Sequence, residues 1–436
     1  MSDLDDWYDY EEDYNEVFLE LDPRTNLIQC SSGVLRSLFP LLSSIVVFAF
    51  IQKVILSFES YLNRKTMDFL VGSLGITFLF YKNVNITSIF VSIAYFLFGF
   101  GFLRIFRTYR YLGPVFIILS LIGTIFQSIL DQALFLSFRG SWMIMTMKLV
   151  SLSFDIHEKD FEDVGFFETF GYVFNPATYF FGLFTSYKRY KEVKGFSSLQ
   201  EDLNSVFLSF AYFVISCFSV FYGDCLLETI PVKIQFLQEF KDAQGFRFGH
   251  YFVNYFLWST ALLGGFRGSD LKIVDALKIE IPRSMEEVVN VYSKTKPMSQ
   301  PIAVVLTFLT SALMHGLNFQ ISAVLISLGV FAYSESAFRS RLSKRLNLCV
   351  KSRSCKTCTH RTGITRFSTV TTYLINFIFV VVNVVLLVYL GMPFDNSETA
   401  PIGYSMDHTL RHWGRWNFGG HGAALNDSNN ENKKIY

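Results

Sequence analysis

The stretch TVTTYLINFIFVVVNVVLLVYLG, from Thr369 to Gly391, contains no charged residue and is long enough to cross a lipid bilayer, which takes about 20 apolar residues in a helix. Five further runs are mostly apolar and near this length, and they lie at 36–57, 67–82, 85–103, 112–137 and 203–223. Because backbone polar groups inside a bilayer must be satisfied internally, we expect all of these runs to be helical. The sequence therefore predicts an all-α, polytopic integral membrane protein with about 8–11 spanning or re-entrant helices.

The composition supports this class and argues against others. Of the 436 residues, 51% are hydrophobic and only 17% are charged, so there is too little polar surface to enclose several soluble cores. The formal net charge is +1, whereas a nucleic-acid-binding protein needs a concentrated basic surface. We therefore expect the lipid bilayer to be a partner of this chain and nucleic acid not to be one. The 49 Phe and 22 Tyr suit either helix packing or the lining of a lipid-shaped cavity.

Four less regular apolar runs are interrupted by Gly, Pro, Asn or His. They lie at 166–187, 248–266, 300–314 and 317–335. Interrupted segments at membrane depth are tolerated only where they are buried in protein or line a cavity. We therefore expect the functional cavity among these segments.

The chain divides into three parts by composition. Residues 1–30 form an acidic, disordered N-terminal tail by this interpretation, residues 31–395 form the multi-span membrane domain, and residues 396–436 form a polar C-terminal tail. Between Arg339 and Arg366 the chain carries nine basic residues and no acidic one. The positive-inside rule assigns this loop to the cytosol, together with the shorter basic segments at 104–110 and 187–194.

His315 is the principal candidate for chemistry, since it is an ionisable residue between two apolar runs. An ionisable side chain at that depth is costly and points to a function by default. A neutral imidazole can accept a hydroxyl proton as a general base, although a histidine hydrogen-bonded within a helix bundle explains the position equally well. His250 opens an aromatic run and could line the same cavity, although an aromatic belt at the membrane interface explains it equally well. The remaining histidines fit solvated surface, and they are His157, His360, His408, His412 and His421.

The six cysteines are spread over the chain, which implies no disulfide framework. Cys349, Cys355, Cys358 and His360 supply enough ligands for zinc, and Cys355 and Cys358 have the spacing of a zinc knuckle. S-acylation and plain reduced thiols are the alternatives for cysteines beside a membrane, and they stay open. We expect no metal in the functional site. The chain contains no Gly-rich phosphate loop, no nucleophile elbow and no His-Glu-x-x-His helix.

The sequence around His315, SALMHG from Ser311 to Gly316, resembles the histidine motif of the membrane-bound O-acyltransferase family. Further stretches resemble one branch of that family. They include Arg139-Gly140, Met147-Lys148, Asn254-Tyr255-Phe256, the segment from Ile281 to Val289, Gly403-Tyr404-Ser405-Met406 and Trp413. This resemblance covers most of the chain from Arg139 to Trp413, so it implies a helical bundle of this family's kind.

The resemblance also implies an activity. In that branch, a cis-monounsaturated sixteen-carbon acyl group passes from palmitoleoyl-CoA to a serine of Wnt proteins in the endoplasmic reticulum membrane, and Wnt secretion and signalling depend on it. His315 would be the catalytic base, with no tightly bound cofactor. From the residues themselves, we expect the acyl tunnel to be lined by Tyr255, Trp258, Ser311 and Asn318. A non-catalytic relative and a membrane transporter are the alternatives.

One stretch departs from the family pattern. Residues 290–299 read NVYSKTKPMS, where the resemblance leads us to expect a Trp-Asn pair. The second polar catalytic residue therefore has no assignment from the sequence, and we expect lower activity than in a typical family member.

Overall fold

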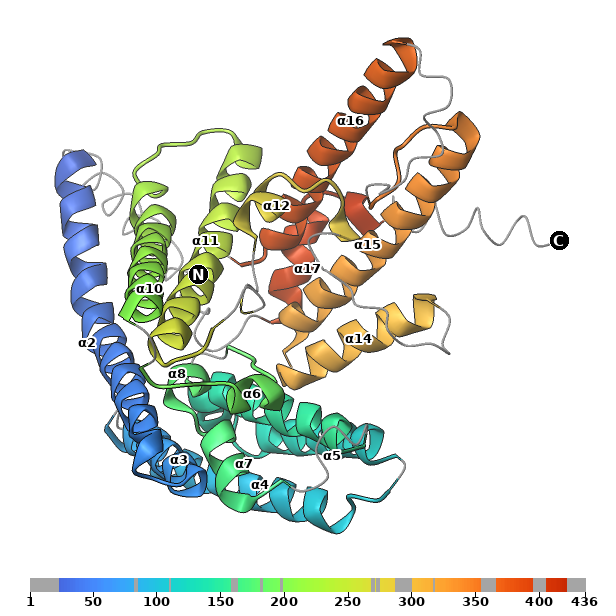
Figure 1. Ribbon diagram of the computed structural model, residues 1–436. Helices are drawn as coiled ribbons and strands as arrows, with labels where there is room; N and C mark the ends of the chain where they lie inside the picture. Colours follow the sequence, from blue (N-terminus) through green and yellow to red (C-terminus); the bar gives the residue numbers. More distant parts are fainter. Residues whose placement is uncertain are drawn as a thin grey trace, which may run out of the picture.

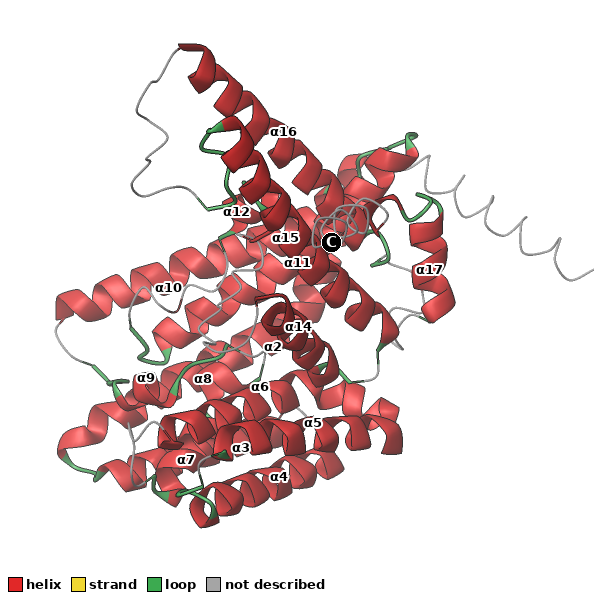
Figure 2. Cartoon of the chain, turned by 90° about the vertical axis from the view of Figure 1, so that its right-hand side faces the viewer, coloured by secondary structure: helices red, strands yellow, loops and turns green. Residues whose placement is uncertain are grey.

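The computed structural model describes residues 23–81, 85–109, 111–157, 164–180, 183–196, 199–267, 271, 275–286, 300–316, 318–353, 366–394 and 405–421. Every regular element within these ranges is a helix (Figure 2). The elements in chain order are α2 (Pro23–Ser57), η1 (Phe58–Ser60), α3 (Arg64–Tyr81), α4 (Ile86–Ile105), α5 (Leu112–Leu130), α6 (Gln132–His157), α7 (Phe166–Val173), α8 (Pro176–Tyr179), α9 (Tyr187–Lys191), α10 (Leu199–Val220), η2 (Phe221–Leu226), α11 (Gln235–Leu263), α12 (Ala276–Glu280), α14 (Gln300–Met314), α15 (Phe319–Leu346), α16 (Arg366–Gly391) and α17 (Met406–Gly414).

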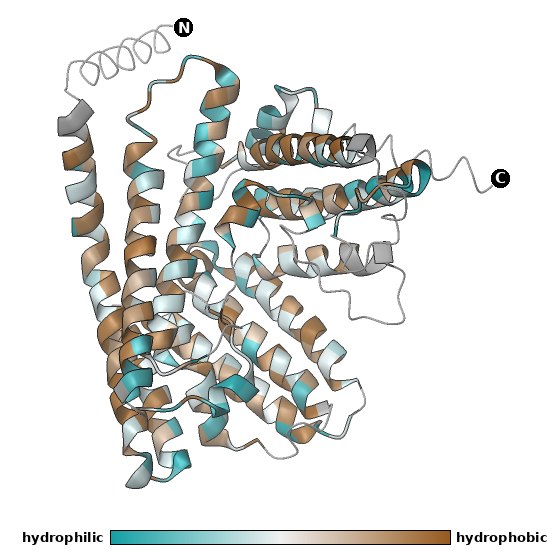
Figure 3. Ribbon diagram, turned by 45° about the horizontal axis from the view of Figure 1, so that its top comes forward, coloured by the Kyte–Doolittle hydropathy of each residue, from teal (hydrophilic) through white to brown (hydrophobic). Residues whose placement is uncertain are grey.

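Six helices of the described chain are long and apolar enough to cross a membrane. They cover 27–60, 86–105, 112–130, 200–226, 319–346 and 369–391. The prediction of an all-α, polytopic membrane protein is therefore confirmed. Apolar residues run along the bodies of these helices, while polar residues gather at many of the loops (Figure 3).

The helices form two groups that meet where α16 packs against α11 and where α14 packs against α5. In one group, α2, α10 and α11 lie side by side, and α3 to α8 lie at the lower end of these helices (Figure 1). Ser209 and Ser216 of α10 donate hydrogen bonds to the carbonyl oxygens of Ser259 and Phe252 in α11, which holds these two helices together. In the other group, α15 and α16 lie side by side and cross the direction of α2, α10 and α11 (Figure 3).

The predicted apolar run 112–137 is not one helix. Asp131 is extended, with φ −151° and ψ 95°, and its side chain accepts a hydrogen bond from the amide of Leu134. The chain therefore turns at Asp131, and α6 begins at Gln132. We did not expect a helix from there to His157, because Arg139 and Lys148 interrupt the apolar pattern.

Lys148 is fully buried, and its position shows how α6 accommodates a charge. Its ammonium group donates to the carbonyl oxygens of Tyr172 at 2.9 Å and Val173 at 3.3 Å, and to the hydroxyl of Thr178 at 2.9 Å. The two carbonyls belong to the last residues of α7, where helix carbonyls lack internal partners. Lys148 therefore stabilises the C-terminal end of α7.

Arg339 is not part of a cytosolic loop, contrary to our prediction, because α15 continues to Leu346 and buries it completely. Its guanidinium donates to the carbonyl oxygens of Val350 and Arg283, each at 2.7 Å. It also donates to Glu335 at 3.1 Å and to the side-chain oxygen of Asn376 at 2.7 Å. Arg339 thus joins α15, α16 and the segment after α12.

Two cysteines form a disulfide bond that the sequence did not predict. Cys30 in the first part of α2 is bonded to Cys225 in η2, 195 residues later in the chain. The spacing of cysteines carries no information about such a long-range pair, and the helix packing alone brings them together. Cys355, Cys358 and His360 lie outside the described residues, so the zinc and S-acylation alternatives stay untested.

Part of the expected C-terminal tail packs against the bundle. The indole of Trp413 in α17 donates to the carbonyl oxygen of Tyr389 in α16 at 2.9 Å. His421 was expected on solvated surface, but its ring nitrogens hydrogen-bond to the hydroxyls of Ser327 and Tyr389, and the rings of Phe331 and Trp413 pack around it. Residues 405–421 therefore cover α15 and α16.

Candidate active site

His315 lies at the break between α14 and α15. α14 ends at Met314, and the side chain of Asn318 caps α15 by accepting a hydrogen bond from the amide of Ile321 at 3.0 Å. Gly316 between them has φ +82°, which glycine adopts without strain. A half-buried histidine is thereby placed at the turn of a hairpin made of two apolar helices.

Gly316 also fixes the position of this turn against the other helix group. A Cβ atom at Gly316 would lie 2.7 Å from the ring of Phe135 in α6 and 3.3 Å from the Cβ atom of Ser128 in α5. Contacts this close require glycine. The backbone beside His315 therefore packs directly on the junction of α5 and α6.

Two ionisable side chains from other helices lie within electrostatic range of His315. They are Arg139 in α6 and His250 in α11. Arg139 lies one helical turn after Phe135, on the same face of α6. Three segments that are far apart in the sequence therefore converge on His315.

The hydrogen bond of His250 shows which ring nitrogen carries the proton when the ring is neutral. Its Nδ1 atom lies 2.9 Å from the carbonyl oxygen of Phe246. Because a carbonyl oxygen only accepts, Nδ1 carries the proton and Nε2 of the neutral ring is left as an acceptor. The sequence left His250 open between lining the cavity and belonging to an aromatic belt at the membrane interface.

The four predicted tunnel residues fall into two places. Ser311 lies one turn before His315 in α14, and Asn318 follows it closely. Tyr255 and Trp258 of α11 instead stack on Tyr212 of α10, with ring centroids 6.0 Å and 3.8 Å apart. The hairpin thus gathers Ser311 and Asn318 around His315, while Tyr255 and Trp258 belong to the α10–α11 contact.

From the sequence, Arg139 was considered only as part of a family motif, and its position near His315 was not predicted. A signal was present, because an arginine within an otherwise apolar stretch is rare and points to function. Residues 290–299, where a second polar catalytic residue was sought, lie outside the described residues. The expectation of lower activity stays a prediction.

Comparison with curated proteins gives several relatives that share one name. The chain is 30% identical to the human protein-serine O-palmitoleoyltransferase porcupine over 360 residues, which cover 71% of this chain and 76% of that protein. It is 29% identical to the mouse protein of that name over 361 residues, with the same shares of 71% and 76%. The Caenorhabditis briggsae protein of that name is 27% identical over 330 residues, which cover 70% of this chain and 73% of that protein. A comparison with protein-family models finds no match.

Proposed function

Because the chain belongs to the porcupine family of protein-serine O-palmitoleoyltransferases, we propose that it transfers a palmitoleoyl group from its coenzyme A thioester to a serine hydroxyl. The observation that carries this proposal is the position of His315, half-buried at a helix break between apolar helices and close to Arg139 and His250. An intramembrane site of this kind lets a lipid thioester and a hydroxyl meet away from bulk water. The resemblance drawn from the motifs agrees with the family of these relatives.

His315 supplies the proton chemistry in this proposal. Its neutral imidazole accepts the serine proton while the serine oxygen attacks the thioester carbonyl carbon. The tetrahedral intermediate then collapses, the carbon–sulfur bond breaks, and the thiolate of coenzyme A takes the proton from the imidazolium. General-base assistance of this type contributes roughly 10²- to 10⁴-fold to a rate.

The proposed acceptors are Wnt proteins, and the proposed membrane is that of the endoplasmic reticulum. Two features, one at each end of the helix bundle, indicate how the chain is oriented across this membrane. The Cys30–Cys225 disulfide ties the start of α2 to η2, and disulfides persist in oxidising compartments such as the lumen. The other end of α2 packs against the segment that follows the basic helix α9, where the hydroxyl of Ser57 accepts a hydrogen bond from the amide of Phe196. The disulfide end is therefore luminal in this proposal.

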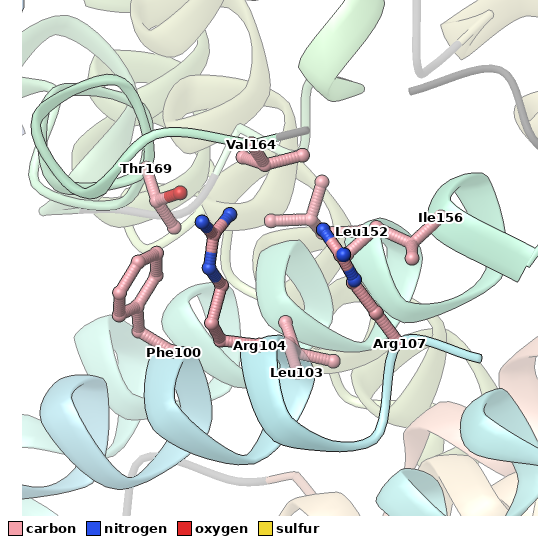
Figure 4. Close-up of a pocket in the computed structure, with 8 residues that line it drawn as sticks. All are labelled: Phe100, Leu103, Arg104, Arg107, Leu152, Ile156, Val164 and Thr169. Atoms are coloured by element: carbon pink, nitrogen blue, oxygen red, sulfur yellow. The ribbon is translucent and has the colours of Figure 1, made fainter. Parts of the chain in front are cut away.

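The end opposite the disulfide carries basic residues. Arg104 and Arg107 at the end of α4 line a small pocket that also includes Thr169 of α7 (Figure 4). Next to Thr169, Glu168 forms an ion pair with Lys191 of the basic helix α9 at 3.6 Å. Clustered Arg and Lys at one end of membrane helices favour the cytosol for that end.

This orientation makes a testable prediction. An Asn-x-Thr glycosylation acceptor placed in the link 227–234, beside the disulfide, is expected to be glycosylated, because glycans are added only in the lumen. The same acceptor placed in 183–196 serves as the matched control and is expected to stay unmodified. Endoglycosidase-sensitive gel shifts measure both. Glycosylation at 183–196, with none at 227–234, would reverse the orientation.

The experiment that tests the proposed function separates it from both alternatives. Full-length protein purified in detergent is incubated with palmitoleoyl-CoA and a serine-containing Wnt peptide, and the peptide mass is measured. We expect a mass increase of one palmitoleoyl group on the serine peptide and none on a peptide with alanine in its place. A transporter or a non-catalytic relative would leave both peptides unmodified.

Gly316 provides a second prediction. Gly316→Ala is expected to lower transfer by about 10²-fold, because the added Cβ meets Phe135 and the positive φ is strained, so that the hairpin shifts by ~1 Å. Gly123→Ala is the control, since no atom lies within 4 Å of a Cβ at Gly123. The measurement is kcat/KM in the peptide assay. Equal loss in both variants would show that the turn at Gly316 does not position His315.

A further inference from the structure

Arg139 is a cation within the membrane domain for which the described chain supplies no partner. Its side chain is half-buried, and among the described residues no hydrogen bond or ion pair involves its guanidinium. A charge held in a low-dielectric region is costly unless it is paired. Within the described residues, Arg139 is therefore open to pairing with a negative group of a bound molecule.

Four other buried or half-buried basic side chains show how this protein accommodates such groups. Lys53 forms an ion pair with Asp202 at 3.1 Å, and Arg247 forms one with Glu280 at 2.8 Å. Arg339 and Lys148 each meet several backbone carbonyl oxygens, as described above. Arg139 differs from all four in having no such partner within the described ranges.

The place of Arg139 indicates which molecule supplies the missing partner. It follows Phe135 by one turn, on the face of α6 that touches Gly316, and Gly316 is the residue next to His315. A bound group that pairs with Arg139 therefore lies on the side of α6 that faces the turn carrying the candidate base. In the proposed reaction, negative charge develops beside that base on the carbonyl oxygen of the thioester.

We propose that Arg139 is a catalytic residue whose guanidinium hydrogen-bonds the oxyanion formed when serine attacks the thioester. This inference rests on the proposed function. As the serine oxygen–carbon bond forms, the carbonyl π electrons move to oxygen, and Arg139 stabilises that charge without giving up a proton. When the carbon–sulfur bond breaks, the carbonyl reforms and the interaction weakens. A donor that meets charge only in the transition state raises kcat and leaves substrate binding largely unchanged.

The test uses the full-length purified protein with palmitoleoyl-CoA and the serine peptide. Arg139→Gln is expected to lower kcat about 10²- to 10³-fold with little change in KM, as is typical for loss of one oxyanion donor. Arg139→Lys keeps the charge and is expected to retain part of the rate. Arg107→Gln is the matched control, because Arg107 is exposed just beyond the end of α4, and its kcat is expected to match the unmodified protein.

A binding measurement distinguishes this role from anchoring of a phosphate. The affinity for a thioether analogue of palmitoleoyl-CoA, which lacks the thioester carbonyl oxygen, is expected to be the same in the unmodified protein, in Arg139→Lys and in Arg139→Gln. Weaker analogue binding with an unchanged kcat would assign Arg139 to a phosphate of coenzyme A or of a lipid and overturn the inference. An unchanged kcat and unchanged binding would overturn it too. Failure of the unmodified protein to acylate the peptide would instead refute the proposed function.

Discussion

Replacing His315 by alanine is expected to reduce acyl transfer by about 10²- to 10⁴-fold while the protein stays folded and still binds palmitoleoyl-CoA. The substitution removes the proton acceptor from the turn between α14 and α15 and leaves the cap by Asn318 and the turn at Gly316 in place. Loss of a general base lowers kcat rather than the affinity for the thioester.

The measurement is the initial rate of peptide acylation at saturating palmitoleoyl-CoA, together with thermal unfolding of each variant. His408→Ala is the matched control, because it also removes an imidazole but from a different element, α17. The hydrogen bond from Trp413 to Tyr389 holds α17 against α16. Its rate is expected to equal that of the unmodified protein. Full transfer by a folded His315→Ala variant would remove His315 from the mechanism.

Arg339→Met is expected to destabilise the protein by about 3–5 kcal/mol, the usual result of removing one partner from a buried ion pair. The guanidinium satisfies the carbonyl oxygens of Arg283 and Val350 and pairs with Glu335, and because Arg339 is fully buried, bulk water does not replace these contacts. Methionine has similar length but no donor, so the carbonyl oxygens of Arg283 and Val350 would lose their hydrogen bonds and Glu335 would lose its ionic partner.

Thermal unfolding followed by size-exclusion chromatography measures this effect. Arg345→Met is the control, since Arg345 is exposed on the same helix and its replacement is expected to change stability by less than about 0.5 kcal/mol. Arg339→Lys is expected to fall between the two, because an ammonium cannot reproduce the forked geometry of a guanidinium. Equal stability of the Arg339→Met and Arg345→Met variants would contradict the described network.

The sequence predicted the features that depend on local pattern. Apolar length predicted the membrane helices, and a single histidine between two apolar runs predicted the residue at the α14–α15 turn. The splitting of 112–137 was missed because one aspartate, Asp131, ends a helix without altering the average hydropathy of the run. Its side chain caps the next helix, which is a local signal that hydropathy does not capture.

Features that depend on tertiary packing were beyond the sequence. The number of basic residues between Arg339 and Arg366 could not show that Arg339 differs from the basic residues of the loop. Its hydrogen-bond partners lie as far as 56 positions before it and 37 positions after it. The pairing of Cys30 with Cys225 and the convergence of Arg139 and His250 on His315 likewise arise from helices far apart in the chain. An ionisable residue inside an apolar stretch was a signal for both Arg139 and His315, but we applied it only to His315.

The central claim is direct transfer from thioester to serine with His315 as base, and a single-turnover experiment tests it most directly. Protein in excess over palmitoleoyl-CoA is mixed with the serine peptide, and free coenzyme A thiol and acylated peptide are measured over time. We expect one thiol released for each serine acylated, with both rates lowered together by about 10²- to 10⁴-fold in His315→Ala. Thiol release without peptide acylation, or rates that are unchanged in His315→Ala, would contradict the claim.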